Sequence, residues 1–260
     1  MEPDVAPELV VVVVPARDEE EQIGTCLAAL ALARGHPEVR EIDVRIIVVL
    51  DSCTDGTAVA AMRHLDDHDE MMTESVGNVG AARRAGLADA LRLADEIGLA
   101  NVWLATSDAD TIVGSDWLAR QLRWRARGFD GVAGTVRVDS WRQYPTGTRG
   151  LYDAHVACLG TGPGHPHVHG ANLGFSAHAY SVVGGMPAIE TGEDQALWKA
   201  LDEGGFRLMA ADDLAVVTSG RMVGRAPDGF AGLLGRFASL QVAGELELAA
   251  CHLPRLRIGS

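Results

Sequence analysis

Two carboxylates, Asp108 and Asp110, come directly after the apolar run Val102–Thr106. The run predicts a buried strand, and residues i and i+2 of an extended segment point to the same side. Two acids this close repel each other unless a cation lies between them. A divalent metal ion that holds the phosphates of a nucleotide fits such a pair. A solvated turn is the alternative for these two residues taken alone, because Asp is common where strands end.

Polar residues also follow two earlier predicted strands. The β-branched run Leu9–Val14 predicts a central strand buried on both faces, and Pro15–Glu19 comes after it. Val44–Leu50 predicts a second buried strand, followed by Asp51–Thr57. Ligands of open α/β sheets bind beyond the carboxyl ends of the strands. The three strand ends therefore predict one binding site at one edge of a parallel sheet.

Helical patterns alternate with these strands, which predicts an α/β fold with right-handed crossovers and a mostly parallel sheet flanked by helices. The segment Arg142–Gly170, rich in Gly, Pro and His, predicts irregular structure. The expected helices are Asp18–Leu32, Thr57–Leu65, Asn78–Ile97, Asp116–Arg127, Asp194–Glu203 and a C-terminal segment containing Phe230 and Leu240; further strands are expected at Val132–Val138, Phe206–Ala210 and Leu214–Thr218.

No linker or internal repeat divides the 260 residues, so one domain is expected. Two halves are expected within it, 9–110 with the three strand ends and 111–225, followed by a C-terminal helical segment at 226–260. The net charge of −14 argues against nucleic-acid binding, which relies on Lys and Arg. No apolar run approaches the roughly 20 residues of a transmembrane segment. The N-terminus has no signal-peptide pattern and the four cysteines are widely spaced, which predicts reduced thiols in a cytoplasmic protein.

Six short motifs follow one another over roughly residues 9 to 220. They are Pro15, Asp18 and Glu19; Asp51, Thr54, Asp55, Gly56 and Thr57; Gly77, Ala81, Ala82, Arg83 and Gly86; Asp108 and Asp110; Gly170, Ala171 and Asn172; and Glu193 and Asp194. No Gly-x-Gly-x-x-Gly follows the first strand, which disfavours a dinucleotide-binding fold. The six motifs in this order resemble family 2 glycosyltransferases, which have the GT-A fold; Arg84 departs from the family pattern, where Asx is usual. The resemblance implies that 9–110 is the nucleotide-sugar-binding half and 111–225 the acceptor-binding half.

The resemblance implies transfer of a sugar from a nucleoside-diphosphate sugar, with Mg²⁺ or Mn²⁺ acting as a Lewis acid on the leaving diphosphate. Asp51 and Arg83 also have purely structural alternatives: Asp51 could cap the next helix, and Arg83 could be an exposed arginine on its helix. In the implied roles, Asp51 binds the nucleobase beside Pro15, Ala16, Arg17 and Glu19; Arg83 contacts the diphosphate or Asp108; Asp108 contacts the ribose or the metal; and Asp110 binds the metal.

The same resemblance implies that Asp194 is the general base. Inverting transfer needs a carboxylate that takes the proton of the attacking acceptor hydroxyl. Asp194 starts a predicted helix, whose dipole favours an ionised carboxylate, although capping that helix is an alternative role. The acceptor-binding residues implied alongside it are His169, Gly170, Ala171, Asn172 and Glu193.

Two basic or histidine-rich segments leave questions open. His165, His167 and His169 alternate and share one face of an extended segment, so zinc binding, acceptor contact and a plain loop all stay open. Arg221 and Arg225 are expected to clamp phosphates, because Arg binds them in bidentate fashion. Some related enzymes place a metal-binding His in this region, but this chain has none between His178 and His252, so a third metal ligand is undetermined.

Alternatives to an inverting transferase also stay open. A retaining GT-A transferase that makes glucosyl- or mannosyl-glycerate-type solutes has the same motifs, and a non-catalytic nucleotide-sugar-binding protein belongs to a different class. A nucleotidyltransferase is disfavoured, because Pro15–Glu19 lacks a Gly-rich signature with Lys. The acceptor is expected to be a small molecule, a lipid head group or a peptide. Whether the protein forms a homodimer is also left open by the sequence.

Overall fold

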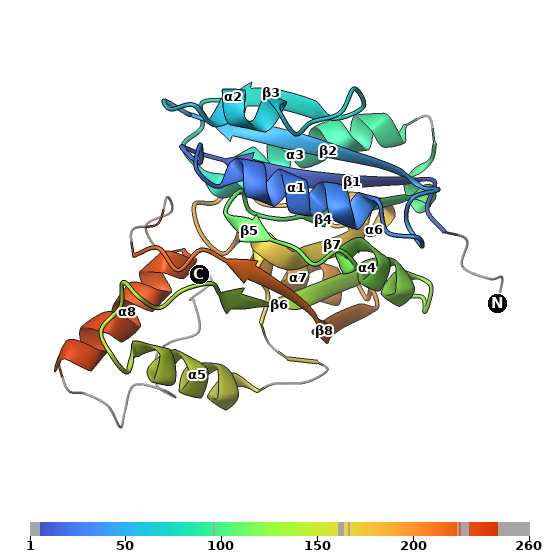
Figure 1. Cartoon of the computed structure of the whole chain (residues 1–260). Coiled ribbons are helices and arrows are strands. Elements are labelled where there is room, and N and C mark those ends of the chain that lie inside the picture. The colour runs from blue at the N-terminus through green and yellow to red at the C-terminus, as the bar shows by residue number, and fades with distance from the viewer. Residues whose placement is uncertain are drawn as a thin grey trace.

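The strands of the protein form one eight-stranded mixed sheet with helices on both faces (Figure 1). The structure is a computed structural model that describes residues 6–95, 97–160, 164–165, 167–222, 224 and 229–243. The strand order is β3-β2-β1-β4-β7-β6-β8-β5. The strands are β1 Leu9–Ala16, β2 Asp43–Asp51, β3 Glu70–Glu74, β4 Val102–Thr106, β5 Thr111–Ile112, β6 Gly131–Val138, β7 Leu173–Ser176 and β8 Leu208–Thr218.

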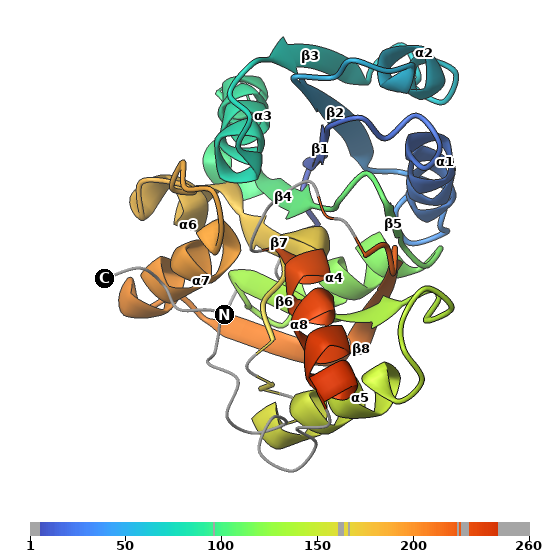
Figure 2. The ribbon, with the colours of Figure 1, turned by 90° about the vertical axis from the view of Figure 1, so that its left-hand side faces the viewer.

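The first four strands in chain order pair with one another in parallel, as β3-β2-β1-β4. Strand β7 runs antiparallel to both β4 and β6, whereas β6 and β8 are parallel and β5 is antiparallel to β8. The predicted mostly parallel α/β sheet is confirmed, and every antiparallel pair involves β5 or β7 of the second half. The carboxyl ends of β1, β2 and β4 therefore lie at the same edge of the sheet, and this edge faces the viewer in Figure 2.

Strand β1 shows why its sequence is continuously apolar. Val10, Val12 and Val14 pack in a core layer with α1, α2 and α4, whereas the alternating residues pack with α3, α6 and α7 on the other face. The helices are α1 Ile23–Arg34, α2 Thr57–Met62, α3 Val79–Ala94, α4 Trp117–Arg125, α5 Thr148–Leu159, α6 Ala177–Val182, α7 Glu193–Glu203 and α8 Phe230–Ala243, with 3₁₀ turns η1 Leu99–Asn101 and η2 Gly170–Asn172.

The first helix begins at Ile23 and not at Asp18. Asp18 adopts a left-handed φ of 52°, which Asp tolerates better than most residues. Its Oδ1 accepts hydrogen bonds from the backbone N–H and the hydroxyl of Thr54, at 2.7 and 3.1 Å. The Glu20 carboxylate similarly accepts from the Gly56 N–H at 2.8 Å. The residues expected to open the helix therefore join the loop after β1 to the loop after β2.

The segment expected to be irregular contains helix α5. Leu151 and Tyr152 of α5 pack against Leu234 and Phe237 of α8, in a third apolar cluster beside the sheet. Figures 1 and 2 both show α5 and α8 side by side. The two short strands expected near the C-terminus are one strand, β8, with a register shift opposite Gly134 and Thr135. Strands β3, β5 and β7 and helix α6 were not predicted.

The cysteines differ from the sequence expectation. Cys26 and Cys53 are free thiols, but Cys158 at the end of α5 is disulfide-bonded. Local spacing could not indicate this bond, because no other cysteine is near Cys158 in the sequence. Among the described residues, no helix combines the length and the apolar character needed to cross a membrane.

Candidate functional site

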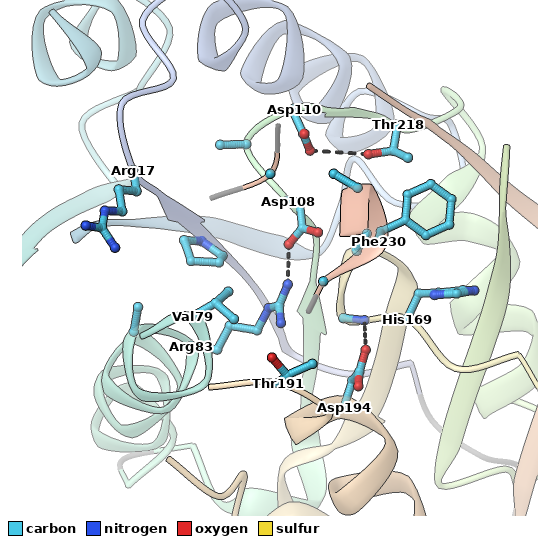
Figure 3. Close-up of a pocket in the computed structure, with 18 of the residues that line it drawn as sticks. Arg17, Val79, Arg83, Asp108, Asp110, His169, Thr191, Asp194, Thr218 and Phe230 are labelled. Atoms are coloured by element: carbon cyan, nitrogen blue, oxygen red, sulfur yellow. Dashed lines mark hydrogen bonds and ion pairs between the residues drawn. The ribbon is translucent and has the colours of Figure 1, made fainter. Parts of the chain in front are cut away.

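A pocket of about 360 Å³ lies where the loops after β1, β2 and β4 meet (Figure 3). Arg17, Asp51 and Asp108 line it from these three loops. Its other side is formed by η2, the start of α7, the end of β8 and the start of α8. A volume of this order is typical of small-molecule sites. The three strand ends that the sequence singled out thus contribute to one cavity.

Asp51 fixes the loop that leads into α3. Its Oδ1 accepts the backbone N–H groups of Val76 and Gly77 at 2.9 and 2.8 Å, and its Oδ2 accepts that of Asn78 at 2.9 Å. The side chain is buried. Asp51 therefore does not cap α2; it holds the loop that forms one wall of the pocket. Its proposed contact with a nucleobase stays a prediction.

Arg83 joins two carboxylates at the centre of the pocket. It is buried in α3 and forms ion pairs with Asp108, just beyond β4, and with Glu193, in the first turn of α7. Figure 3 shows its guanidinium directed at Asp108. Burial disfavours the charged form, but the charges of Asp108 and Glu193 outweigh this and raise the pKa of Arg83. Arg83 is thus not an exposed helical arginine.

Asp110 is bound by a second arginine. Its Oδ2 lies 2.7 Å from Nη2 of Arg221, and its Oδ1 accepts the Thr218 hydroxyl at 3.2 Å. The same guanidinium lies 2.6 and 2.8 Å from the two carboxylate oxygens of Glu19. Burial raises the pKa of Asp110 and the charge of Arg221 opposes that rise. Both aspartates that the sequence suggested as metal ligands therefore have an arginine partner.

The fit of a divalent ion can be judged from these donors. Mg²⁺ takes about six oxygen ligands and is usually bound through one or two carboxylates together with substrate phosphates and waters. Asp108 and Asp110 are each engaged by a guanidinium. Within the described part of the chain, no group of three His, Cys, Asp or Glu side chains could hold a metal ion. These residues do not fit a metal held by the protein.

Glu193 and Asp194 differ in their access to the pocket. Glu193 is only 3% exposed and pairs with Arg83, whereas Asp194 is partly exposed. Asp194 accepts the Gly170 N–H at Oδ2 and the Gln195 N–H at Oδ1, both at 2.7 Å. Burial raises the pKa of Glu193 to about 7 and also raises that of Asp194. Asp194 is therefore the oriented carboxylate that a ligand could reach.

An apolar wall that sequence reasoning missed completes the pocket. Val168, Phe230 and Leu233 line it together with His169, and the His169 ring lies edge-on to Phe230 with centroids 5.8 Å apart. Burial lowers the pKa of His169 to about 4, so its ring is neutral at pH 7. The apolar spacing in the C-terminal segment predicted helix α8. Nothing in that spacing indicated that the first turn of α8 lines the pocket.

Among the three histidines of the histidine-rich segment, His169 lines the pocket, whereas His165 and His167 do not. His165 is buried, and neither of its ring nitrogens has a hydrogen-bond partner among the described residues. The ring centroids of His165 and His167 are 5.4 Å apart. The aromatic residues Trp141, Tyr144 and Tyr152 belong to the apolar cluster that contains α5 and α8.

Asn172 is a correction to the expected acceptor site. It is fully buried, its Oδ1 accepts the Trp117 indole N–H at 2.8 Å, and its Nδ2 donates to the carbonyls of Thr135 and Leu214 at 2.9 Å. These bonds tie α4, β6 and β8 together and direct the amide away from the cavity. Arg225 lies outside the described residues. The remaining candidates, Pro15, Ala16, Arg17, Glu19, Gly170, Ala171 and Arg221 among them, line the pocket.

Solved structures share this architecture at low sequence identity. The mannosyltransferase PcManGT from Pyrobaculum calidifontis, in complex with GDP-Man and Mn²⁺, superposes with a TM-score of 0.60 at 22% identity over 96% of this chain and 74% of that chain. S. aureus TarS 1-349 in complex with UDP gives 0.58 at 16% over 94% and 68%, respectively. Glucosyl-3-phosphoglycerate synthase from Mycobacterium tuberculosis, with Mn²⁺, UDP and phosphoglyceric acid, gives 0.56 at 18% over 95% and 80%. These likenesses establish the GT-A fold.

Sequence comparison identifies the family. A search of curated proteins finds no match to the chain. The profile described as "Glycosyl transferase family 2" matches residues 11–181, which is most of the sequence and includes β1, β2, β4 and Asp108–Asp110. The order of the motifs, the GT-A sheet and the pocket at its carboxyl edge agree with that match. The chain belongs to glycosyl transferase family 2 and is a glycosyltransferase.

Proposed function

We propose that the protein transfers a sugar from a nucleoside-diphosphate sugar to an acceptor hydroxyl, with inversion at the anomeric carbon. The observation that carries this proposal is the position of Asp194, a partly exposed carboxylate in the same pocket as the ends of β1, β2 and β4. One side of the pocket can thus bind the donor while the other offers a base to the acceptor.

In the proposed step, the acceptor oxygen attacks the anomeric carbon while its proton passes to Asp194. The bond between that carbon and the diphosphate oxygen breaks, and the electron pair leaves with the nucleoside diphosphate. Two backbone N–H groups orient the Asp194 carboxylate, and its raised pKa makes it a stronger base. Glu193 is less suited to this role, because it is buried against Arg83.

The donor side is proposed to comprise the loop after β1, Asp51, Arg83 and Asp108, within a donor-binding half at 9–110. Pro15, Ala16 and Arg17 face the same cavity as the loop that Asp51 holds. PcManGT was solved with GDP-Man and TarS 1-349 with UDP, which supports a nucleotide-sugar donor here.

A divalent ion is not included in this step. Mg²⁺ or Mn²⁺ at Asp110 is the expectation from the sequence, and PcManGT was solved with Mn²⁺. In this chain, however, the Asp110 carboxylate is paired with Arg221 and Asp108 with Arg83. The proposed step therefore relies on the protein's own side chains.

The acceptor side is proposed to bind a small molecule, a lipid head group or a peptide that presents a hydroxyl to Asp194. Val168, His169 and Phe230 give this side an apolar and uncharged wall, on which the carbon face of an acceptor can pack. The cytoplasmic location stays a prediction.

The proposal is tested in two steps. A thermal-shift screen of nucleoside diphosphates first identifies the base, because a ligand that binds the folded state raises its melting temperature. The matching sugar donors are then incubated with acceptor libraries, and the linkage of the product is read by NMR. We expect release of the nucleoside diphosphate and an inverted linkage. A retained configuration would contradict the role of Asp194, and the absence of binding by any nucleoside diphosphate would contradict the function.

A further inference from the structure

The Arg221 guanidinium lies between two shielded carboxylates, Glu19 in the loop after β1 and Asp110 in the loop after β4. Nη2 is 2.7 Å from Asp110, and Nη1 is 2.6 Å from one oxygen of Glu19. The side chains of Glu19, Asp110 and Arg221 are 5%, 10% and 23% exposed, so the group is shielded from solvent but still reaches the pocket. Because an arginine does not lose its proton in proteins, this charge is permanent.

Three hydrogen bonds to the backbone of residues 219–221 fix the position of Arg221. The Ser219 N–H donates to the carbonyl of Asp110 at 3.2 Å, and the Gly220 N–H donates to Asp139 Oδ1 at 2.8 Å. The Tyr144 hydroxyl donates to the carbonyl of Arg221 at 2.9 Å. Gly220 has no room for a side chain, because a Cβ there would lie 2.1 Å from the Ser140 carbonyl oxygen. The guanidinium is therefore built into the site by the fold.

The two carboxylates explain the choice of an arginine. Glu19 and Asp110 both contact one guanidinium, and two buried acids this close would otherwise repel each other. The planar fork can hold both acids and still direct N–H donors at a phosphate oxygen, which a compact ammonium group does less well. A divalent ion at Asp110 would have to displace this guanidinium or approach it against like charge.

We propose that Arg221, and not a protein-bound divalent ion, contacts the diphosphate of the donor at Asp110 and donates charge-assisted hydrogen bonds to it. This inference rests on the proposed function and concerns the same site. As the bond to the anomeric carbon breaks, negative charge develops on the leaving diphosphate oxygen. A fixed cation at that place stabilises the charge without any reorganisation. Asp110 and Glu19 hold the guanidinium, so donor binding and transfer do not require Mg²⁺ or Mn²⁺.

The test is calorimetric titration of the full chain with UDP and with GDP, once in EDTA and once in MnCl₂. We expect the affinity of the parent protein for the nucleoside diphosphate it binds to agree within about threefold between the two conditions. A fall of about tenfold or more in EDTA would overturn the inference while leaving the proposed function intact. If neither nucleotide nor any other nucleoside diphosphate binds in either condition, the proposed function fails and the inference fails with it.

Two variants sharpen the test. Arg221→Ala leaves Glu19 and Asp110 facing each other, so we expect affinity in EDTA to fall about tenfold and MnCl₂ to restore part of it. Arg221→Lys keeps the charge and serves if the alanine variant does not fold; it should lose less affinity in EDTA. Arg149→Ala, an exposed arginine on α5, is the control and should match the parent. Unchanged affinity in the folded Arg221→Ala variant would overturn the inference.

Discussion

Arg83 pairs with Glu193 across 110 residues of sequence, and this contact connects α3 to the first turn of α7. The same guanidinium binds Asp108, so one buried arginine positions an acid of the proposed donor site and the neighbour of the proposed base. The two sides of the pocket are thereby coupled. A change at Arg83 should affect both stability and the alignment of the two substrates.

We expect Arg83→Ala to lower the free energy of unfolding by about 3–5 kcal/mol, because Glu193 would remain as an unpaired buried charge. Urea denaturation followed by circular dichroism measures the change. The neighbouring Arg84 is exposed on the same helix, so Arg84→Ala should change stability by less than about 0.5 kcal/mol. Equal stability of the two variants would show that the Arg83 ion pairs do not form.

Asp194→Asn should abolish turnover and leave donor binding nearly intact. The amide keeps an oxygen for the Gly170 N–H but cannot take a proton, so we expect kcat to fall by about 10²–10⁴-fold. Calorimetry with the nucleoside diphosphate should give an affinity close to that of the parent. Asp202→Asn, on the exposed face of the same helix, is the matched control. A parental kcat in Asp194→Asn would remove Asp194 from the role of base.

The pH dependence of kcat tests the same residue without a mutation. Burial raises the pKa of Asp194, and a general base acts only when it is deprotonated. The rate should therefore fall as the pH is lowered through this raised pKa, on a limb above the value of about 4 for an exposed aspartate. The measurement is kcat at saturating donor and acceptor, with circular dichroism at each pH to verify folding. A limb at or below the exposed value would contradict the assignment.

The sequence predicted the donor side of the pocket more fully than the acceptor side. Buried parallel strands such as Leu9–Val14 appear as continuous apolar runs, and their ends must meet at one edge of the sheet. Strand β3 has no such pattern, because it is a partly exposed edge strand. Helix α5 begins just after Pro145 and Gly147, and its apolar residues pack against α8, which is far away in the sequence.

The side-chain partners within the site could not be read from the sequence. The pairing of Arg221 with Asp110 brings together the loop after β8 and the loop after β4, and no local spacing encodes that distance. Motif order likewise placed Asn172 beside the acceptor, although the bulk of Trp117 and the carbonyls of β6 and β8 direct its amide inward. Tertiary packing decides which residues of a motif reach the cavity.

The structural role of Asn172 leads to a last prediction. Asn172→Ala would leave the Trp117 indole N–H and the carbonyls of Thr135 and Leu214 without their partner in the core. Buried polar groups without partners cost about 1–3 kcal/mol each, so we expect the free energy of unfolding to fall by about 3 kcal/mol or more. Where the variant is folded, its kcat and its KM for the acceptor should stay near those of the parent, because the amide does not face the pocket. An acceptor KM raised about tenfold, with parental stability, would instead restore Asn172 to the acceptor site.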